Sequence, residues 1–73
     1  MAAFNERLKE LRTSKGLSQK QLSIEIKISD RGIQRYEYGE REPSMSTLID
    51  LADYFDVSLD YLCGRSDNPK INK

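Results

Sequence analysis

Short helical segments with clear start and stop signals follow one another along this chain, and they restrict the fold more than any other feature. Serine, whose hydroxyl can accept hydrogen bonds from the free amides of a first helical turn, begins four segments: Ser18, Ser29, Ser44 and Ser58. Glycine, which readily ends a helix in the left-handed conformation, closes three: Gly16, Gly39 and Gly64. The pattern predicts short helices joined by short connections.

Five helices are expected in total. They span about Asn5–Lys15, Ser18–Lys27, Ser29–Tyr38, Ser44–Phe55 and Leu59–Cys63, with Asn5 as the first cap. Apolar residues at helical spacing predict one small core: Leu8, Leu11, Leu17, Leu22, Ile26, Ile28, Ile33, Tyr36, Leu48, Leu51, Ala52, Phe55, Val57 and Leu62. We therefore predict an all-α fold with one domain at residues 1–64 and a flexible tail at residues 65–73.

Charge is balanced in sum but divided along the chain. Twelve basic and twelve acidic residues give a formal net charge of zero, which at first disfavours a nucleic-acid partner. Residues 1–41, however, contain nine basic and six acidic residues, whereas residues 42–64 contain five acidic residues and no basic one. A basic first half can face phosphates while the acidic half faces away.

The composition disfavours an enzyme. Histidine is absent, and Cys63 is the single cysteine, so the chain has no usual base, triad or zinc ligand set. We expect no cofactor and no metal, and we interpret Cys63 as a small buried hydrophobic residue rather than a redox sensor. With no disulfide, leader or membrane-spanning run, the expected setting is cytoplasmic.

The segment from Gln19 to Ile33 carries the functional signal. Two short helices meet there across a break around Lys27 and Ile28, and this spacing predicts a sharp turn with the second helix packed across the first. The outward face of that second helix is rich in side chains that can bond base edges: Asp30, Arg31, Gln34 and Arg35. A protruding helix of this kind fits the major groove of B-DNA.

At this point the sequence resembles the lambda-repressor/Cro-type helix-turn-helix proteins, or XRE family, over residues 4 to 64. The matching stretches are LRTSKGLSQKQLS and ISDRGIQRYEYGEREPSMSTLIDLADYFDVSLDYL. The resemblance implies a lambda-repressor-like fold whose second and third helices form the helix-turn-helix. It also implies a sequence-specific transcriptional regulator, most commonly a repressor, bound to double-stranded DNA.

The resemblance assigns roles to particular side chains. Asp30, Arg31 and Arg35 face base edges, with Gln34 close by. Gln19, Ser29 and the loop from Tyr38 to Arg41 contact phosphates, while Arg12 pairs with Glu37 as a structural brace. Two alternatives stay open: Asp30 only favours the helix N-terminus electrostatically, and the two arginines form an ordinary solvated face.

Four departures from the family pattern are expected to have local effects. Lys27 stands where the turn commonly has glycine, which suggests a left-handed residue, and Ser23 replaces a small buried alanine. Ile24 is either a partner contact or an ordinary exposed residue. Gly32 weakens the third helix and is a candidate for close approach of the backbone to DNA.

A homodimer is expected, because one helix reads only a few base pairs and paired half-sites supply specificity. The candidate contacts lie in the last helices and the tail: Tyr54, Leu59, Tyr61, Leu62 and Ile71. The alternative is that these residues are simply core or tail. The rival function is a protein-interaction module, such as an antitoxin or adaptor with an unknown protein partner, which zero net charge, Asp30 and Gly32 favour.

Overall fold

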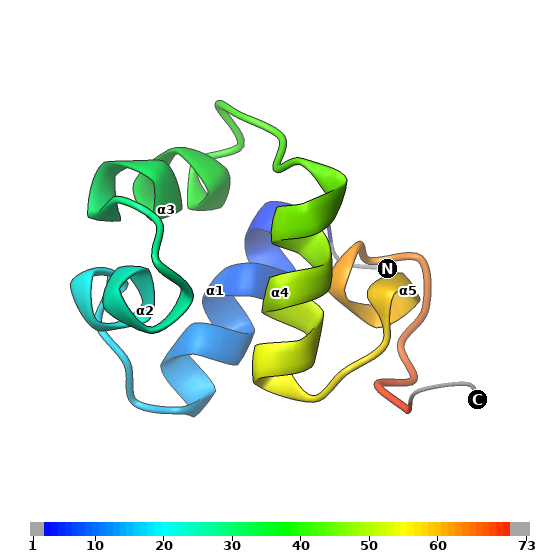
Figure 1. Ribbon diagram of the computed structural model, residues 1–73. Coiled ribbons are helices and arrows are strands. Elements are labelled where there is room, and N and C mark those ends of the chain that lie inside the picture. Colours follow the sequence, from blue (N-terminus) through cyan, green and yellow to red (C-terminus); the bar gives the residue numbers. More distant parts are fainter. Residues whose placement is uncertain (1–2, 71–73) are drawn as a thin grey trace.

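The computed structural model describes residues 3–70, and within that range all regular structure is helical (Figure 1). The helices are α1 (Phe4–Ser14), α2 (Gln19–Ile26), α3 (Asp30–Glu37), α4 (Met45–Phe55) and α5 (Leu59–Leu62). The α2–α3 pair and α5 lie at opposite ends of the molecule, with α1 and α4 between them (Figure 1). The prediction of an all-α fold with five short helices is confirmed.

Serine hydroxyls set where four of the five helices begin. In each case the serine Oγ accepts a hydrogen bond from the amide three residues later, at Gln21, Gly32, Thr47 and Tyr61. At Ser18 the bond is reciprocal, because the Gln21 side chain accepts from the Ser18 amide at 2.7 Å. These caps satisfy backbone donors that would otherwise lack a partner, and they confirm the boundaries expected for these helices to within a residue or so.

The prediction for the start of α1 was wrong. Ala3 is the cap residue and offers no side-chain bond, and Asn5 lies within the first turn. The Phe4 ring packs edge-on against Tyr36, with 6.2 Å between ring centroids. This aromatic contact with α3 holds Phe4 in the helix, so a tertiary interaction takes the place of a local cap.

In the part of the chain that the structure describes, two residues other than glycine have left-handed backbone conformations and end helices. Lys27 has φ 58° at the end of α2, as its replacement of a turn glycine suggested, and Ile28 then donates its amide to Ser23 O. Asp56 has φ 56° at the end of α4, which the sequence did not reveal. Both residues turn the chain sharply where the next helix must fold back.

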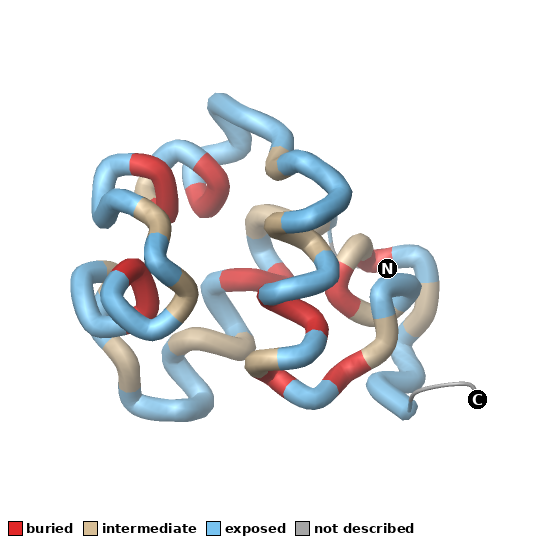
Figure 2. Tube along the Cα trace, viewed as in Figure 1, coloured by how far each residue is buried: buried red, intermediate tan, exposed pale blue. Residues whose placement is uncertain are grey.

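The core draws one fully buried side chain from every helix: Leu8, Leu22, Ile33, Leu51 and Leu62. The buried stretches in Figure 2 are spread over all five helices. Five other residues of the predicted core are only partly buried and pack against this centre: Leu11, Leu17, Ile26, Ile28 and Leu48. The predicted core is therefore largely present, with Arg7 an unexpected buried member.

The chain beyond α5 does not leave the body directly. Residues 65–70 were expected to be part of a flexible tail, but Ser58 donates its amide to Pro69 O at 3.0 Å and Asp67 pairs with Arg7. Residues 71–73 lie outside the described part of the chain. Among residues 3–70, no helix has the length and apolar character needed to cross a lipid bilayer.

Candidate nucleic-acid interface

The α2–α3 unit has the geometry of a tight helix-turn-helix. Its turn contains Lys27, Ile28 and Ser29, with the left-handed Lys27 supplying the change of direction. Ser23 is buried in α2, and its hydroxyl donates to Lys20 O at 2.6 Å, as expected for a small residue beneath a crossing helix. These features allow α3 to pack closely on α2 while its other face remains outside.

The outer face of α3 carries the side chains expected to read bases. Asp30, Arg31 and Arg35 are exposed, and Gln34 is half-buried. Asp30 Oδ1 also accepts a hydrogen bond from the Arg31 amide at 2.9 Å, so its carboxylate already has a local partner at the start of the helix. This contact agrees with the simpler interpretation of Asp30 as a residue that stabilises the helix N-terminus.

Three arginines meet at one shallow groove beside α3. The groove has a volume of about 220 Å³, and its lining consists of Ser29, Arg31, Gly32, Arg35 and Arg41. Arg41 comes from the loop after α3, so the fold brings a predicted phosphate contact next to two predicted base contacts. The result is a concave basic surface whose charge suits a polyanion.

Gly32 is explained by packing within the protein. A Cβ atom at this position would lie 2.9 Å from Ile28 Cγ2 and 3.2 Å from Ser29 Oγ, and the residue is buried. The turn side chains therefore occupy the space that a larger residue would need. A residue with a side chain at this position would force the turn to shift.

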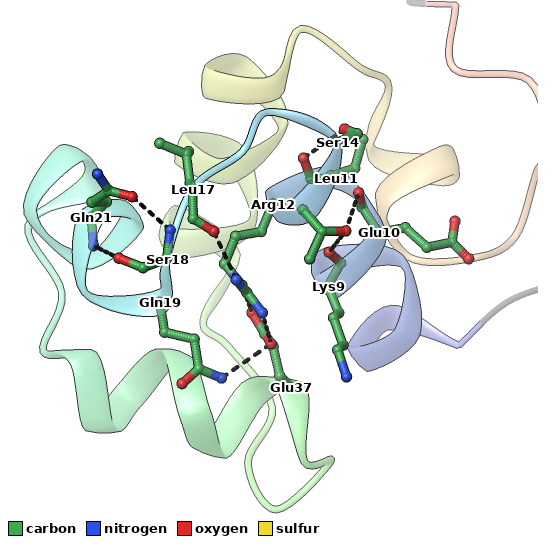
Figure 3. Close-up of polar contacts among 11 residues, drawn as sticks. Lys9, Glu10, Leu11, Arg12, Ser14, Leu17, Ser18, Gln19, Gln21 and Glu37 are labelled. Atoms are coloured by element: carbon green, nitrogen blue, oxygen red, sulfur yellow. Dashed lines mark hydrogen bonds and ion pairs between the residues drawn. The ribbon is translucent and has the colours of Figure 1, made fainter.

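A nearly buried ion pair braces α1 against α3 behind this surface (Figure 3). Arg12 Nε and Nη2 lie 2.6 Å and 3.0 Å from the two carboxylate oxygens of Glu37, and Arg12 Nη1 donates to Leu17 O at 2.7 Å. The Glu37 side chain is 2% exposed. The bond to Glu37 raises the pKa of Arg12, against the lowering effect of burial. The expected Arg12–Glu37 brace is present.

Gln19 joins this network, which sequence reasoning missed. Its side-chain Nε2 donates to Glu37 Oε1 at 3.2 Å (Figure 3). The side chain predicted to touch phosphate is thus oriented by the buried carboxylate. No local pattern reveals this contact, because the two residues are eighteen positions apart in sequence.

The other predicted phosphate contacts lie around the ends of α3. Tyr38 is 68% exposed at its C-terminal end, and Arg41 is exposed in the following loop. Ser29 is exposed at the N-terminal end, where its Oγ accepts from the Gly32 amide and keeps its own proton free to donate.

Most of the predicted dimer contacts are engaged within the chain. Leu62 is fully buried, so its assignment as a dimer contact was wrong. The Tyr54 ring stacks edge-on with Phe55, and the Tyr61 ring lies under the Arg7 guanidinium. Leu59 remains 39% exposed beside Ile49, in a groove of about 350 Å³ whose lining is both polar and apolar. Ile71 lies outside the described residues.

Cys63 is half-buried at the end of α5. Burial raises the pKa of its thiol, with a further contribution from the negative charge of Asp60. Because the thiolate is the reactive form of cysteine, this environment disfavours redox chemistry at Cys63 and agrees with a packing role.

Comparison with known proteins identifies the family. The helix-turn-helix family model HTH_3 matches residues 8–62. The HTH-type transcriptional regulator YqaE of Bacillus subtilis is 40% identical over 68 residues, covering 93% of this chain and 59% of the relative. The phage CTXphi transcriptional repressor RstR of Vibrio cholerae is 42% identical over 62 residues, covering 85% of this chain and 55% of the relative. The chain thus spans less than three-fifths of their length.

The fold has a close counterpart among solved structures. The P22 c2 repressor, solved in complex with a synthetic operator, superposes with a TM-score of 0.83 at 26% identity, covering 90% of this chain and all of that one. The five helices thus form a lambda-repressor-like domain, as the resemblance implied. The chain belongs to the XRE-type helix-turn-helix family, a family of transcriptional regulators and not of enzymes.

Proposed function

We propose that this chain is a sequence-specific DNA-binding repressor that places α3 in the major groove of a roughly palindromic operator. The observation that carries the proposal is the basic groove formed by Arg31, Arg35 and Arg41 at the exposed face of α3. A helix and its side chains fit the width of the major groove, and guanidinium groups there meet both phosphates and base edges. The site of action is the cytoplasm, where operator DNA is found.

Base reading is assigned to the exposed face of α3. Arg31 and Arg35 lie one helical turn apart and can each donate two hydrogen bonds to guanine O6 and N7, so each half-site should contain a G·C pair. Gln34, which is half-buried, lies at the edge of this face. Asp30 either accepts from a cytosine amine or holds the first turn of α3 in place, and its contact with the Arg31 amide favours the second role.

Phosphate binding is assigned to residues at the start of α2, in the turn before α3 and at the end of α3 and the loop after it: Gln19, Ser29, Tyr38 and Arg41. Such contacts fix the position of a protein on DNA without reading sequence. The amide of Gln19 is oriented by Glu37, which supplies a preformed contact next to the start of α2. Repression is supported by relatives: RstR is named a transcriptional repressor, and the c2 protein is a repressor solved with an operator.

A homodimer would join two such domains so that each reads one half-site about one helical turn from the other. Within the described residues, the exposed apolar pair Ile49 and Leu59 is the surface best suited to this contact. Tyr54 and Tyr61 can contribute only through the parts of their rings that remain exposed.

Selection of bound duplexes from a random pool, followed by sequencing, tests the proposal directly. A palindrome with G·C pairs in each half-site is the expected result. The distance between its two half-sites would then give the separation of the two α3 helices in the dimer. Failure to enrich any sequence at low salt would instead favour the protein-interaction module.

Substitutions then test the assignment of the two contact types. Arg35→Ala should relax specificity at one base position. Arg41→Ala should weaken binding equally on all sequences, and it should reduce the slope of the log binding constant against the log salt concentration by about one. Arg65→Ala removes an exposed arginine beyond α5 and is the matched control. Equal effects of the first two substitutions on every sequence would mean that the reading face is misplaced.

A further inference from the structure

Arg7 is a buried cation that the DNA-binding surface does not use. Its side chain is 6% exposed and lies over the Tyr61 ring, with 3.8 Å between Cζ and the ring centroid. Nη2 donates to Asp67 Oδ1 at 3.2 Å, whereas Nε is buried and has no hydrogen-bond partner among residues 3–70. Burial alone would lower the pKa of Arg7, but its contacts with Tyr61 and Asp67 raise it overall. Arg7 therefore stays charged inside the protein.

The carboxylate that balances this charge comes from outside the helical body. Asp67 belongs to residues 65–70, which we call the strap, and its side chain is 75% exposed. The contact also differs from the Arg12–Glu37 pair, in which Nε and Nη2 both bond a carboxylate that is 2% exposed. Arg7 uses only one of the same two nitrogens. The side chain of Asp67 thus holds the strap through a single hydrogen-bonded ion pair with Arg7, and its carboxylate is largely exposed to solvent.

The rest of the attachment of the strap is made by backbone hydrogen bonds. Asp60 O accepts from the amides of Arg65 and Ser66 at 2.8 Å and 3.2 Å, and Pro69 O accepts from the Ser58 amide at 3.0 Å. None of the residues 65–70 is buried. Because docking the strap removes little apolar surface from water, its separation should cost much less free energy than opening the core.

From these contacts we infer that the strap is a conformational device: it docks and undocks as a unit on the folded helices, and Arg7 is the latch that holds it closed. Undocking removes the Asp67 carboxylate from the Arg7 guanidinium, which is left over the Tyr61 ring of α5. The helix α5, from which the strap extends, lies at the end of the molecule opposite the α2–α3 pair (Figure 1). The strap can therefore change state without altering the proposed DNA-reading surface, and the inference does not depend on DNA binding.

Native-state amide hydrogen exchange, followed by NMR on the full chain, measures this opening residue by residue. The Ser58, Arg65 and Ser66 amides report strap docking, because the bonds that protect them are those between the strap and the body. The Leu51 amide, in the middle of α4, reports opening of the core. In the unmodified protein the three strap amides should exchange at least about tenfold faster than the Leu51 amide, as expected for local opening.

The Asp67→Asn substitution removes the charge that holds the latch. It should accelerate exchange of the three strap amides about fivefold, the upper range for an ion pair with one exposed partner, and leave Leu51 unchanged. Asp67→Glu keeps the charge, so its three strap amides should exchange at the rates of the unmodified protein. Asp53→Asn is the matched control, since Asp53 is an exposed carboxylate of α4 that makes no ion pair within the described residues.

Two results would overturn the inference. Strap amides that exchange no faster than Leu51 in the unmodified protein would show that the strap does not open separately. An Asp67→Asn protein whose strap amides match those of Asp53→Asn, or whose core amides accelerate equally, would show that Arg7 is not a latch for this segment.

Discussion

Replacing Glu37 by glutamine should be among the most damaging single changes on the surface of α3 that faces α1. Glutamine keeps the shape of the side chain but removes the charge and places an amide donor against the donors of Arg12. The bonds at 2.6 Å and 3.0 Å are then disturbed together, as is the bond from Gln19. The Arg12 guanidinium is left without a counter-charge at a site where only 11% of the side chain reaches solvent.

The expected loss in the free energy of unfolding is about 3 kcal/mol, the lower end of the range for breaking a buried pair. The lower end applies because Arg12 retains its bond to Leu17 O at 2.7 Å. A domain of this size has roughly 4–11 kcal/mol of stability in total, so the variant should fold but with a much reduced margin.

Urea unfolding followed by far-UV circular dichroism measures this loss from the midpoint and slope. Glu40→Gln, at an exposed position in the loop after α3, is the control and should change stability by less than about 0.5 kcal/mol. A double variant, Arg12→Met with Glu37→Leu, should recover much of the loss, because an apolar pair of similar volume removes the buried charge altogether. A Glu37→Gln variant as stable as the Glu40→Gln control would refute this account of the pair.

Three further predictions concern the helix ends. Lys27→Gly should raise the urea midpoint, corresponding to a gain of about 0.5–1 kcal/mol, because φ 58° strains lysine but suits glycine; an unchanged or lower midpoint would contradict this. Gly32→Ala should lower thermal stability, corresponding to a loss of about 1–2 kcal/mol despite its better helix propensity, since its Cβ would lie 2.9 Å from Ile28 Cγ2. A higher melting temperature of the Gly32→Ala variant would show that the turn accommodates a Cβ atom at this position. Cys63 should react with a thiol reagent at pH 8 more slowly in the folded protein than in urea, because burial raises the pKa of its thiol; equal rates would show that the fold does not protect it.

Local signals determine most of what could be predicted about the fold. The capping serines and apolar spacing gave the helix boundaries, because each depends on residues three or four positions apart. The start of α1 was missed because Phe4 is held by Tyr36, which is distant in sequence. Leu62 was expected both in the core and among the dimer contacts, because spacing alone does not distinguish a buried face from an interface in a four-residue helix; the structure confirms the core position.

The candidate site was predictable in its residue types but not in its supporting contacts. The polar face of α3 follows from helical periodicity, and the Arg12–Glu37 brace came from family resemblance. The bond from Gln19 to Glu37 and the position of Arg41 beside Arg35 depend on how three separate segments pack. The same reason explains why a buried Arg7 could not be foreseen: the Tyr61 ring that it lies over comes from the far end of the chain.

Each helix supplies one of the five side chains that solvent does not reach. A peptide containing only α2 and α3 would keep Leu22 and Ile33 but lose the other three, and its two helices of eight residues are too short to persist alone in water. The fixed orientation of the arginines of α3 therefore depends on helices outside the α2–α3 pair. Grafting α3 onto another scaffold would have to transplant its supporting neighbours as well.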